Sequence, residues 1–199
     1  MLLADPGVEI WYGEEVHFHL HTTITRMWAP KGRQPEIPSK PGRAKVGLFD
    51  AINPATGELF FKEVQNFNTQ TFTGFLLEFH ALRKERASKK IVLIVDNAAY
   101  HKKAVRELGT REGQIVFLPP YSPDLNPMER VWRWTRRCCT HNKYFDYPLE
   151  LLATVGSFLA EYKEPNEILQ SLCAINNFCV ADYIAPSPRA LSGSSRPPW

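Results

Sequence analysis

The run Ile91–Asp96, with the sequence IVLIVD, is the feature that most restricts how this chain can fold. Its five consecutive aliphatic residues leave no polar face, which is typical of a strand buried on both sides in the middle of a sheet. Strands buried in this way need helices on both faces of the sheet. The run therefore predicts an α/β domain, and Asp96 at its carboxyl end lies where open α/β sheets collect reactive groups.

The segments before this run predict an antiparallel start to the sheet. Val8–Leu20 and Lys45–Ile52 are rich in β-forming residues. The turn Asn53–Gly57 then joins the second of them to Leu59–Val64, which makes a hairpin. After this hairpin, strands and helices alternate, and such an order requires right-handed parallel crossovers. The predicted fold class is therefore α/β, with a mixed five-stranded sheet and helices on both faces.

Apolar residues at helical spacing predict the remaining elements. Thr69 is a candidate N-cap for the first helix, and Asn126 followed by Pro127 marks the start of a later one. The expected helices cover 69–90, 103–108, 126–141, 149–162 and 168–181, and a short strand covers 114–118. Together they supply the helices that the buried central strand needs.

Proline-rich segments interrupt this order in three places. Residues 28–43 hold four prolines and two glycines and predict a long loop or irregular hairpin. Residues 119–125 (PPYSPDL) hold three prolines and predict a non-helical loop, because proline removes backbone donors. Residues 185–199 hold four prolines and four serines and predict a disordered tail, so we expect one domain over 1–184.

Composition excludes several classes of protein. Hydrophobic residues make up 44% of the chain and charged residues 23%, which excludes a wholly disordered protein. No apolar run approaches the roughly 20 residues of a membrane span, and the N-terminus lacks a signal-peptide core. We therefore expect a cytoplasmic protein with no membrane partner. The cysteines lack the spacing of a zinc or disulfide framework and are expected to be reduced: Cys138, Cys139, Cys173 and Cys179.

Positive charge is concentrated in two blocks, although the net charge of the chain is only +3. Each block carries a local charge of +5. The basic residues are Arg26, Lys31, Arg33, Lys40, Arg43 and Lys45 in the first block and Arg130, Arg133, Arg136, Arg137 and Lys143 in the second. Such segregation favours contact with a polyanion such as nucleic acid, and solvated basic faces are the alternative. Arg130, Arg133 and Arg137 have the three-and-four spacing of one helical face and offer a phosphate track.

Four acidic residues are expected near one edge of the sheet. Asp96 ends the buried strand, and Glu129 lies in the first turn of the helix after the proline loop. Glu14 and Glu15 lie within the first strand region, where side chains alternate, so one should face each side of the sheet. Three converging carboxylates bind hard divalent cations such as Mg²⁺ or Mn²⁺. Two such ions roughly 3.5–4 Å apart carry out phosphoryl transfer.

Each acid also has a purely structural interpretation. Asn126 and Glu129 fit a helix-capping pattern, in which Glu129 would turn back to its own helix N-terminus. Asp96 would start a turn after the strand. The two glutamates of the first strand would be ordinary charges on an edge strand. Taken together, in this topological order, the acids favour the functional interpretation.

Three motifs resemble those of bacterial insertion-sequence transposases of the mariner superfamily. They are IVLIVDNAAYH at 91–101, LPPYSPDLNPMERVW at 118–132 and TRMWAPKG at 25–32. PPYSPDLNPME is the most specific of them, and the match extends over about residues 8–162. The family carries a DDE superfamily endonuclease domain of the ribonuclease-H-like fold, which resembles the retroviral integrase core. The resemblance implies a domain of this kind, and the PPYSPDLNPME loop argues against a related nuclease acting on RNA.

The resemblance implies three catalytic, metal-binding acids, Glu14, Asp96 and Glu129, which would hold two Mg²⁺ or Mn²⁺ ions. Thirty-two residues separate Asp96 from Glu129, close to the family's usual spacing. The family normally places an aspartate followed by a glutamate on the first strand, whereas this chain has Glu14 and Glu15. The extra methylene moves the carboxylate outward, and Mg²⁺ tolerates poor octahedral geometry badly. We therefore expect either activity at a reduced rate or an inactive, decayed remnant that binds DNA nonspecifically.

Residues around these acids receive supporting roles from the same resemblance. The supporting residues are Glu15, Asn97, His101, Asp124 and Asn126. Asp124 is expected to organise the loop, whereas Asn97 and His101 would either assist the site or be buried and hydrogen-bonded. The expected DNA contacts are Lys31, Arg33, Arg130, Arg133 and Arg137.

The activity implied by the resemblance is metal-dependent DNA cleavage and strand transfer during transposition of an insertion sequence. Element ends and target DNA would be the partners, and a homodimer the active complex. Family members also carry N-terminal helix-turn-helix modules, whereas this chain begins almost directly at the first strand. We expect a fragment, or one of two reading frames with the DNA-reading part encoded separately. Such a chain would bind DNA mainly through phosphates.

Overall fold

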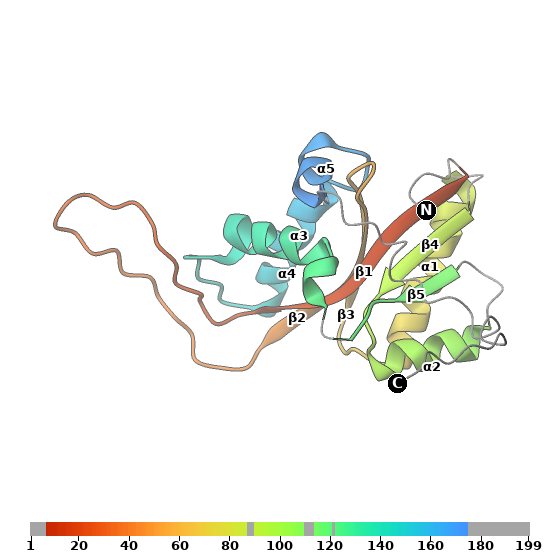
Figure 1. The fold of residues 1–199 in the computed structure, drawn as a ribbon. Helices are drawn as coiled ribbons and strands as arrows, with labels where there is room; N and C mark the ends of the chain where they lie inside the picture. Colours follow the sequence, from red (N-terminus) through yellow and green to blue (C-terminus); the bar gives the residue numbers. More distant parts are fainter. Residues whose placement is uncertain (1–6, 87–89, 110–113, 121, 175–199) are drawn as a thin grey trace, which may run out of the picture.

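A five-stranded mixed sheet forms the centre of the protein (Figure 1). The computed structural model describes residues 7–86, 90–109, 114–120 and 122–174. The strands are β1 (Val8–His19), β2 (Lys45–Asn53), β3 (Glu58–Val64), β4 (Lys90–Val95) and β5 (Gln114–Phe117), in the spatial order β3-β2-β1-β4-β5. β2 pairs antiparallel with β1 and β3, whereas β4 pairs parallel with β1 and β5. The predicted mixed sheet is confirmed.

Helices cover both faces of this sheet, as predicted (Figure 1). One face carries α1 (Thr69–Arg86) and α2 (Ala99–Leu108), and the other carries α3 (Met128–Thr135), α4 (Pro148–Ala160) and α5 (Glu167–Cys173). Phe72, Phe75 and Phe79 recur at helical spacing on α1 and fill the first core. Val131 of α3 and Leu151 of α4 belong to the second core. The central strands are thus buried on both sides, as their composition requires.

The pleat of the central strands divides their side chains between the two cores. Trp11 and Phe49 point towards α1 and α2, whereas Tyr12 and Leu48 point towards α3, α4 and α5. β4 serves both cores in the same way, and Leu93 is fully buried. The face to which any polar side chain on these strands is directed therefore follows from its position along the strand.

Two helices start at residues other than those predicted. Asn68 caps α1, because its Oδ1 accepts the N–H of Thr71 at 3.0 Å. The prediction of Thr69 as the cap is therefore wrong by one residue, since either side chain satisfies the sequence pattern. α2 begins at Ala99, earlier than the predicted Lys103, because its first turn follows directly from the turn after β4.

The segment after β5 also differs in detail from the prediction. The proline loop contains the 3₁₀ turn η2 (Pro123–Leu125), so the non-helical prediction is wrong there; a single short turn needs few backbone donors. The helix expected over 126–141 starts at Met128, and its last turn is the π-helix η3 (Arg136–Thr140). The helix expected over 168–181 is described as far as Cys173. The predicted tail, 185–199, lies outside the described residues.

The connection from β1 to β2 is a long irregular loop that extends away from the sheet, as predicted (Figure 1). The backbone N–H of Leu20 donates to the carbonyl of Ala44 at 2.9 Å and closes its base. Trp28 within it is fully exposed. Among the described helices, none has the length and apolar character needed to cross a membrane.

A buried cation fastens α1 to two strands. Arg83 is 5% exposed, and its two terminal nitrogens lie 2.6 Å from carboxylate oxygens of Glu9 on β1 and Glu58 on β3. Its guanidinium carbon also lies 4.8 Å from the centre of the Trp11 ring. Because one cation serves two acids from separate strands, removing it would leave two carboxylates without this partner in a partly dry site.

We expect Arg83→Ala to lower the free energy of unfolding by about 3–5 kcal/mol, since breaking a buried ion pair from one side leaves uncompensated charge. Denaturant unfolding of the purified protein measures this change. Lys84→Ala is the matched control, because Lys84 is its exposed neighbour on the same helix, and its effect should stay within about 0.5 kcal/mol. If the two variants lowered the free energy of unfolding equally, the ion pairs of Arg83 would not be what stabilises this part of the fold.

Candidate active site

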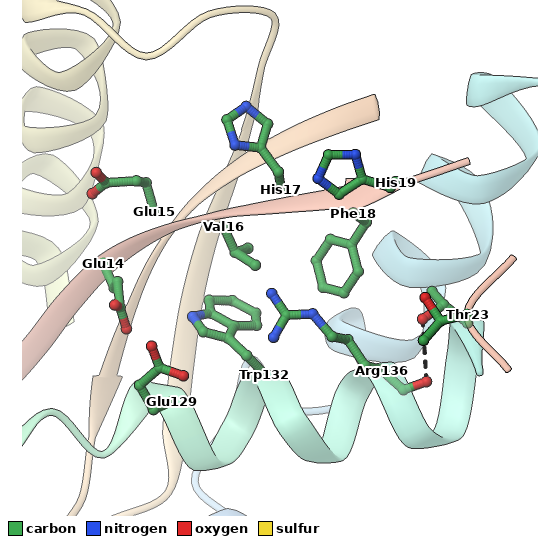
Figure 2. A pocket seen from close by; sticks show the side chains of 11 residues that line it. Glu14, Glu15, Val16, His17, Phe18, His19, Thr23, Glu129, Trp132 and Arg136 are labelled. Carbon is green, nitrogen blue, oxygen red and sulfur yellow. Dashed lines mark hydrogen bonds between the residues drawn. The ribbon is translucent and has the colours of Figure 1, made fainter. Parts of the chain in front are cut away.

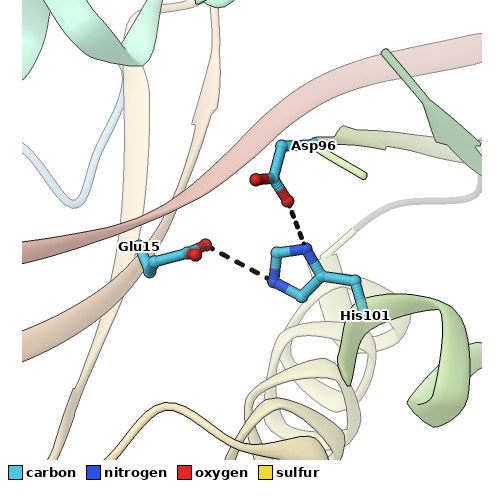
Figure 3. A group of neighbouring side chains, drawn as sticks. All are labelled: Glu15, Asp96 and His101. Carbon is cyan, nitrogen blue, oxygen red and sulfur yellow. Dashed lines mark hydrogen bonds and ion pairs between the residues drawn. The ribbon is translucent and has the colours of Figure 1, made fainter. Parts of the chain in front are cut away.

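β1 directs two consecutive acids to opposite faces of the sheet. Glu14 points towards α3, and Glu15 points towards α2 (Figures 2 and 3). This is the alternation predicted for the pair. β1 is the middle strand of the sheet, so the alternative of ordinary edge-strand charges is wrong. Each acid therefore enters a different layer of the protein.

Glu14 and Glu129 line one cleft of about 300 Å³ between β1 and the helix formed by α3 and η3. Figure 2 shows their carboxylates turned towards each other across this cleft. Trp132 and Arg136 lie along the same helix and line the cleft as well. Glu129 therefore does not turn back to its own helix N-terminus, and the capping interpretation of this residue is wrong.

Asn126 fixes the first turn of α3 against β1. Its side-chain nitrogen donates to the carbonyl of Gly13 at 3.3 Å, and its side-chain oxygen accepts the N–H of Met128 at 3.1 Å. Asn126 itself is 3% exposed. Because Gly13 directly precedes Glu14 in the chain, this one side chain sets the position of Glu129 relative to Glu14.

Asp96 follows the last residue of β4, beside Glu14. Tyr12 pairs with Ile94 in the parallel ladder, and the negative charge of Asp96, two residues beyond Ile94, acts on the carboxyl group of Glu14, two residues beyond Tyr12. Oδ1 of Asp96 accepts the N–H of Ala98 at 3.0 Å, so the predicted turn is confirmed. The Asp96 side chain is 47% exposed. The acid thus combines a turn-forming role with a place next to Glu14.

His101 of α2 connects Asp96 with Glu15 (Figure 3). Its Nδ1 lies 2.6 Å from Oδ1 of Asp96, in a hydrogen bond that the carboxylate accepts, and its Nε2 lies 3.5 Å from Oε2 of Glu15. The bond from His101 lowers the pKa of Asp96, whereas burial raises the pKa of Glu15. One potential ligand atom from each of the three residues lies within 4.8 Å of the others, which is a geometry that can also hold a cation.

Asn97 and Asp124 occupy structural positions near these acids. The side-chain nitrogen of Asn97 donates to the carbonyl of Leu118 and so ties the end of β4 to the end of β5. Asp124 is exposed within η2. His101 is buried and hydrogen-bonded, whereas Asn97 is hydrogen-bonded but only partly buried.

Burial, together with the crowding of acids, raises the pKa of Glu14 to about 8. Burial is the largest cause, followed by the negative charges of Glu129, Glu15 and Asp96, and the cation of Arg136 opposes them. A further acid lies next to Glu14, because Asp50 is its direct partner in the β1–β2 ladder. Burial raises the pKa of Asp50 well above its usual range, and the charge of Glu14 adds to the effect. The site thus concentrates negative charge in a partly dry cleft.

The basic residues predicted to bind DNA are spread over two regions. Arg133 and Arg137 are exposed on α3 and η3. The guanidinium of Arg130 donates to the carbonyl of Ala174 at 2.9 Å, at the end of α5. Lys31 and Arg33 are exposed on the long β1–β2 loop and do not line the cleft.

Sequence reasoning missed two residues of this site, Arg136 and Asp50. Arg136 follows Glu129 by seven residues, which is two helical turns, so the helical period placed it on the same face as the acid. Asp50 is a single acid within the apolar strand KVGLFDAIN, which is a signal of a functional or paired charge. Neither signal identifies the partner without the register of the sheet.

The fold and the acidic cleft define an α/β domain of the ribonuclease-H-like class, with carboxylates gathered where β4 ends beside β1. The sequence model of the DDE superfamily endonuclease family matches residues 9–151. The chain belongs to this family. The resemblance proposed from the motifs is therefore confirmed.

Two similar proteins come from bacteria. The insertion element IS630 uncharacterized 39 kDa protein of Shigella sonnei is 28% identical over 153 residues, which are 75% of this chain and 44% of that protein. The uncharacterized protein y4pE/y4sA of Sinorhizobium fredii is 43% identical over 102 residues, which are 50% of this chain and 73% of that protein. The chain thus spans less than half the length of the insertion element protein.

Among solved structures, the Mos1 mariner paired end complex with Mn is similar at a TM-score of 0.62 and 18% identity. The match covers 83% of this chain and 51% of that chain. The Mos1 paired end complex with Mg matches at a TM-score of 0.59 and 15% identity, over 83% of this chain and 52% of that one. These likenesses confirm the predicted ribonuclease-H-like fold.

We expect Glu14→Gln to stabilise the metal-free protein at pH 9 and to leave its stability unchanged at pH 4. The pKa of Glu14 rises from an ordinary value of 4.5 to about 8 on folding, so between these values the folded state binds more protons than the unfolded state. The free energy of unfolding of the wild type must then fall as the pH rises through this range, by roughly 2–4 kcal/mol, and glutamine removes the fall.

Denaturant unfolding in EDTA at several pH values measures this difference. Glu107→Gln on the exposed side of α2 is the control and should follow the wild type at every pH. A wild type and a Glu14→Gln variant of equal stability at pH 9 would show that Glu14 ionises freely.

Proposed function

We propose that this chain is the catalytic domain of a DDE-type transposase, which cleaves DNA phosphodiester bonds and joins 3′-hydroxyl ends to target DNA during transposition of an insertion sequence. The observation that carries the proposal is that Glu14 faces Glu129 across the cleft, with Asp96 near enough for its charge to act on Glu14, in a member of the DDE superfamily endonuclease family. The three acids are the proposed catalytic residues. Their order along the chain is the one that the motifs predict.

The chemistry of these side chains fits a divalent cation. Oε2 of Glu14 is buried and has no hydrogen-bond partner among the described residues. Its neighbours are mainly acids, and oxygen ligands of this kind suit Mg²⁺ and Mn²⁺. The similar Mos1 complexes are described as containing Mn and Mg. We therefore assign Glu14, Asp96 and Glu129 as ligands of two Mg²⁺ or Mn²⁺ ions.

Protein side chains would position the acids and the DNA phosphate around these ions. When bound, two divalent ions activate the attacking oxygen and stabilise the leaving oxygen of a phosphodiester. Asn126 holds Glu129 at a fixed distance from β1, and His101 orients Asp96 through its 2.6 Å contact. Arg136 lines the cleft beside Glu129 and presents a cation to a phosphate group.

DNA would approach along the exposed side of α3 and η3. Arg133 and Arg137 offer cations to the phosphate backbone, and Lys31 and Arg33 on the long loop extend the basic surface. Arg130 also belongs to this surface, although its guanidinium already donates to the end of α5. We infer a homodimer as the active complex and a separately encoded helix-turn-helix part that reads the element ends, in a bacterial cell's cytoplasm.

We expect Asp96→Asn and Glu129→Gln each to reduce metal-dependent nicking or joining of DNA by at least about 100-fold, because each loses a charged ligand without a change of shape. Nicking of supercoiled plasmid by the 199-residue chain with Mn²⁺ and with Mg²⁺ measures the activity. Glu14→Asp, which restores the family's usual residue, should raise the rate with Mg²⁺.

The control for this series is Asp146→Asn, which removes an exposed acid remote from the cleft and should retain the wild-type rate. Unchanged activity in Asp96→Asn or Glu129→Gln would refute the assignment of the acids. Absence of nicking by both the wild type and Glu14→Asp would instead support the alternative of a decayed, DNA-binding remnant.

We also expect the double variant Arg133→Ala/Arg137→Ala to weaken DNA binding and to reduce its dependence on salt. Each lost phosphate contact lowers the slope of log K against log salt by about 0.9. Titration of a labelled DNA duplex at several salt concentrations measures both quantities. The control is Lys102→Ala/Lys103→Ala on α2, which removes the same charge from the opposite face of the sheet. An equal loss of DNA affinity in this control would show that DNA does not bind specifically along α3 and η3.

A further inference from the structure

Asp50 is an acid that the proposed chemistry does not yet use. It is the direct partner of Glu14 in the antiparallel ladder between β1 and β2, so both side chains leave the sheet on the same face. Leu48 and Ile52, its alternate neighbours on β2, lie in the core beneath α3 and α4. The carboxylate of Asp50 is therefore directed to the layer that holds Glu14 and Glu129.

The Asp50 carboxylate is fully enclosed, and the described residues offer it no hydrogen bond. The residue is 0% exposed, and among the described residues neither of its side-chain oxygens has a hydrogen-bond partner. Leaving a buried carboxylate without a partner costs several kcal/mol. Within the part of the chain that the structure describes, the charged neighbour that acts on Asp50 is Glu14, another acid, which adds to this cost. A group that supplies positive charge would satisfy both side chains at once.

Two acids lie side by side across the strands at this point. Asp50 on β2 and Glu14 on β1 are direct partners in the ladder, and the charge of Asp96, after β4, acts on Glu14 from nearby. Glu129 faces Glu14 from α3. A cation held by Glu14 would therefore have further acids beside it, on β2 and on α3.

We propose that Asp50 is a fourth carboxylate of the metal centre and that it binds, together with Glu14, the divalent cation of this site. The inference rests on the proposed function and deepens it. It also gives a chemical reason why a glutamate can stand at position 14. Asp50, a shorter acid on the adjacent strand, would supply a further oxygen on the same side of the ion. The proposed centre then has the ligand set Asp50, Glu14, Asp96 and Glu129.

Metal binding itself tests this inference. Titration of the metal-free 199-residue chain with Mn²⁺, followed by calorimetry and by the electron paramagnetic resonance signal of free Mn²⁺, gives the affinity without reference to activity. We expect Asp50→Asn to weaken Mn²⁺ binding by about 10–100-fold, the range found when a conserved group around a metal is lost. Asp146→Asn is the matched control and should bind Mn²⁺ as the wild type does.

Thermal unfolding distinguishes a metal ligand from a structural residue, because the two roles predict different changes in the midpoint temperature of unfolding. Replacing a buried carboxyl group that has no hydrogen-bond partner among the described residues should leave the metal-free midpoint of Asp50→Asn equal to that of the wild type or raise it. The rise in midpoint on adding Mn²⁺ should become smaller. A lower metal-free midpoint with an unchanged response to Mn²⁺ would show that Asp50 is a structural residue and would overturn the inference.

The remaining outcomes separate this inference from the proposed function. If Asp96→Asn and Glu129→Gln lose Mn²⁺ affinity while Asp50→Asn stays within twofold of the wild type, Asp50 lies outside the centre and shares a proton with Glu14, and the proposed function stands. If the wild type does not bind Mn²⁺, the metal assignment of the proposed function fails and the inference fails with it. Failure of both Asp50→Asn and Asp50→Ser to fold would also overturn the inference. Such a result would mean that Asp50 stabilises the metal-free fold, whereas the proposal assigns its carboxylate to the metal ion.

Discussion

The position of β1 between an antiparallel and a parallel neighbour is the constraint on which the candidate site depends. Its ladder with β2 places Asp50 opposite Glu14, and its ladder with β4 brings Asp96 to the other side. A slip of one residue in either pairing would send Glu14 to the face of α1 and α2. Burial of aliphatic and aromatic side chains on both faces opposes such a slip, because every strand residue would then enter the wrong core. Hydrophobic packing thus fixes the positions of the charged groups.

Most of the fold follows from local patterns in the sequence. The buried run before Asp96, the hairpin around the turn at 53–57 and the helical spacing of the α1 phenylalanines each have one structural solution. The details that differ depend on contacts between distant segments. Arg83 lies in a stretch that reads as a solvated basic helix end, yet it is buried because Glu9 and Glu58 reach it from two strands. Helical periodicity contains no information about such partners.

The residues of the candidate site also fall into two groups, those that the sequence predicts and those that depend on contacts between distant segments. The three acids could be predicted because each lies next to a recognisable boundary: a strand end, a helix start or a pair of charges in a strand. Their catalytic role remains a prediction. Asp50 and Arg136 could not be placed, since one needs the strand register and the other needs the packing of α3 against β1. His101 was expected near Asp96, but its second contact, with Glu15, exists because α2 crosses the layer that this acid enters.

The arrangement also shows why a longer acid at position 14 is compatible with this fold. The side chain of Asn126 ties the first turn of α3 to the backbone of β1, a contact that does not involve the side chain at position 14. Glutamate fills more of the cleft than aspartate and has one more rotatable bond, which makes the position of its carboxylate less defined. A fixed acid beside it would compensate, since an ion held by two carboxylates from adjacent strands has fewer positions available than an ion held by one. The position of the ion would then be restricted by the acid on β2, and not by the Glu14 side chain alone.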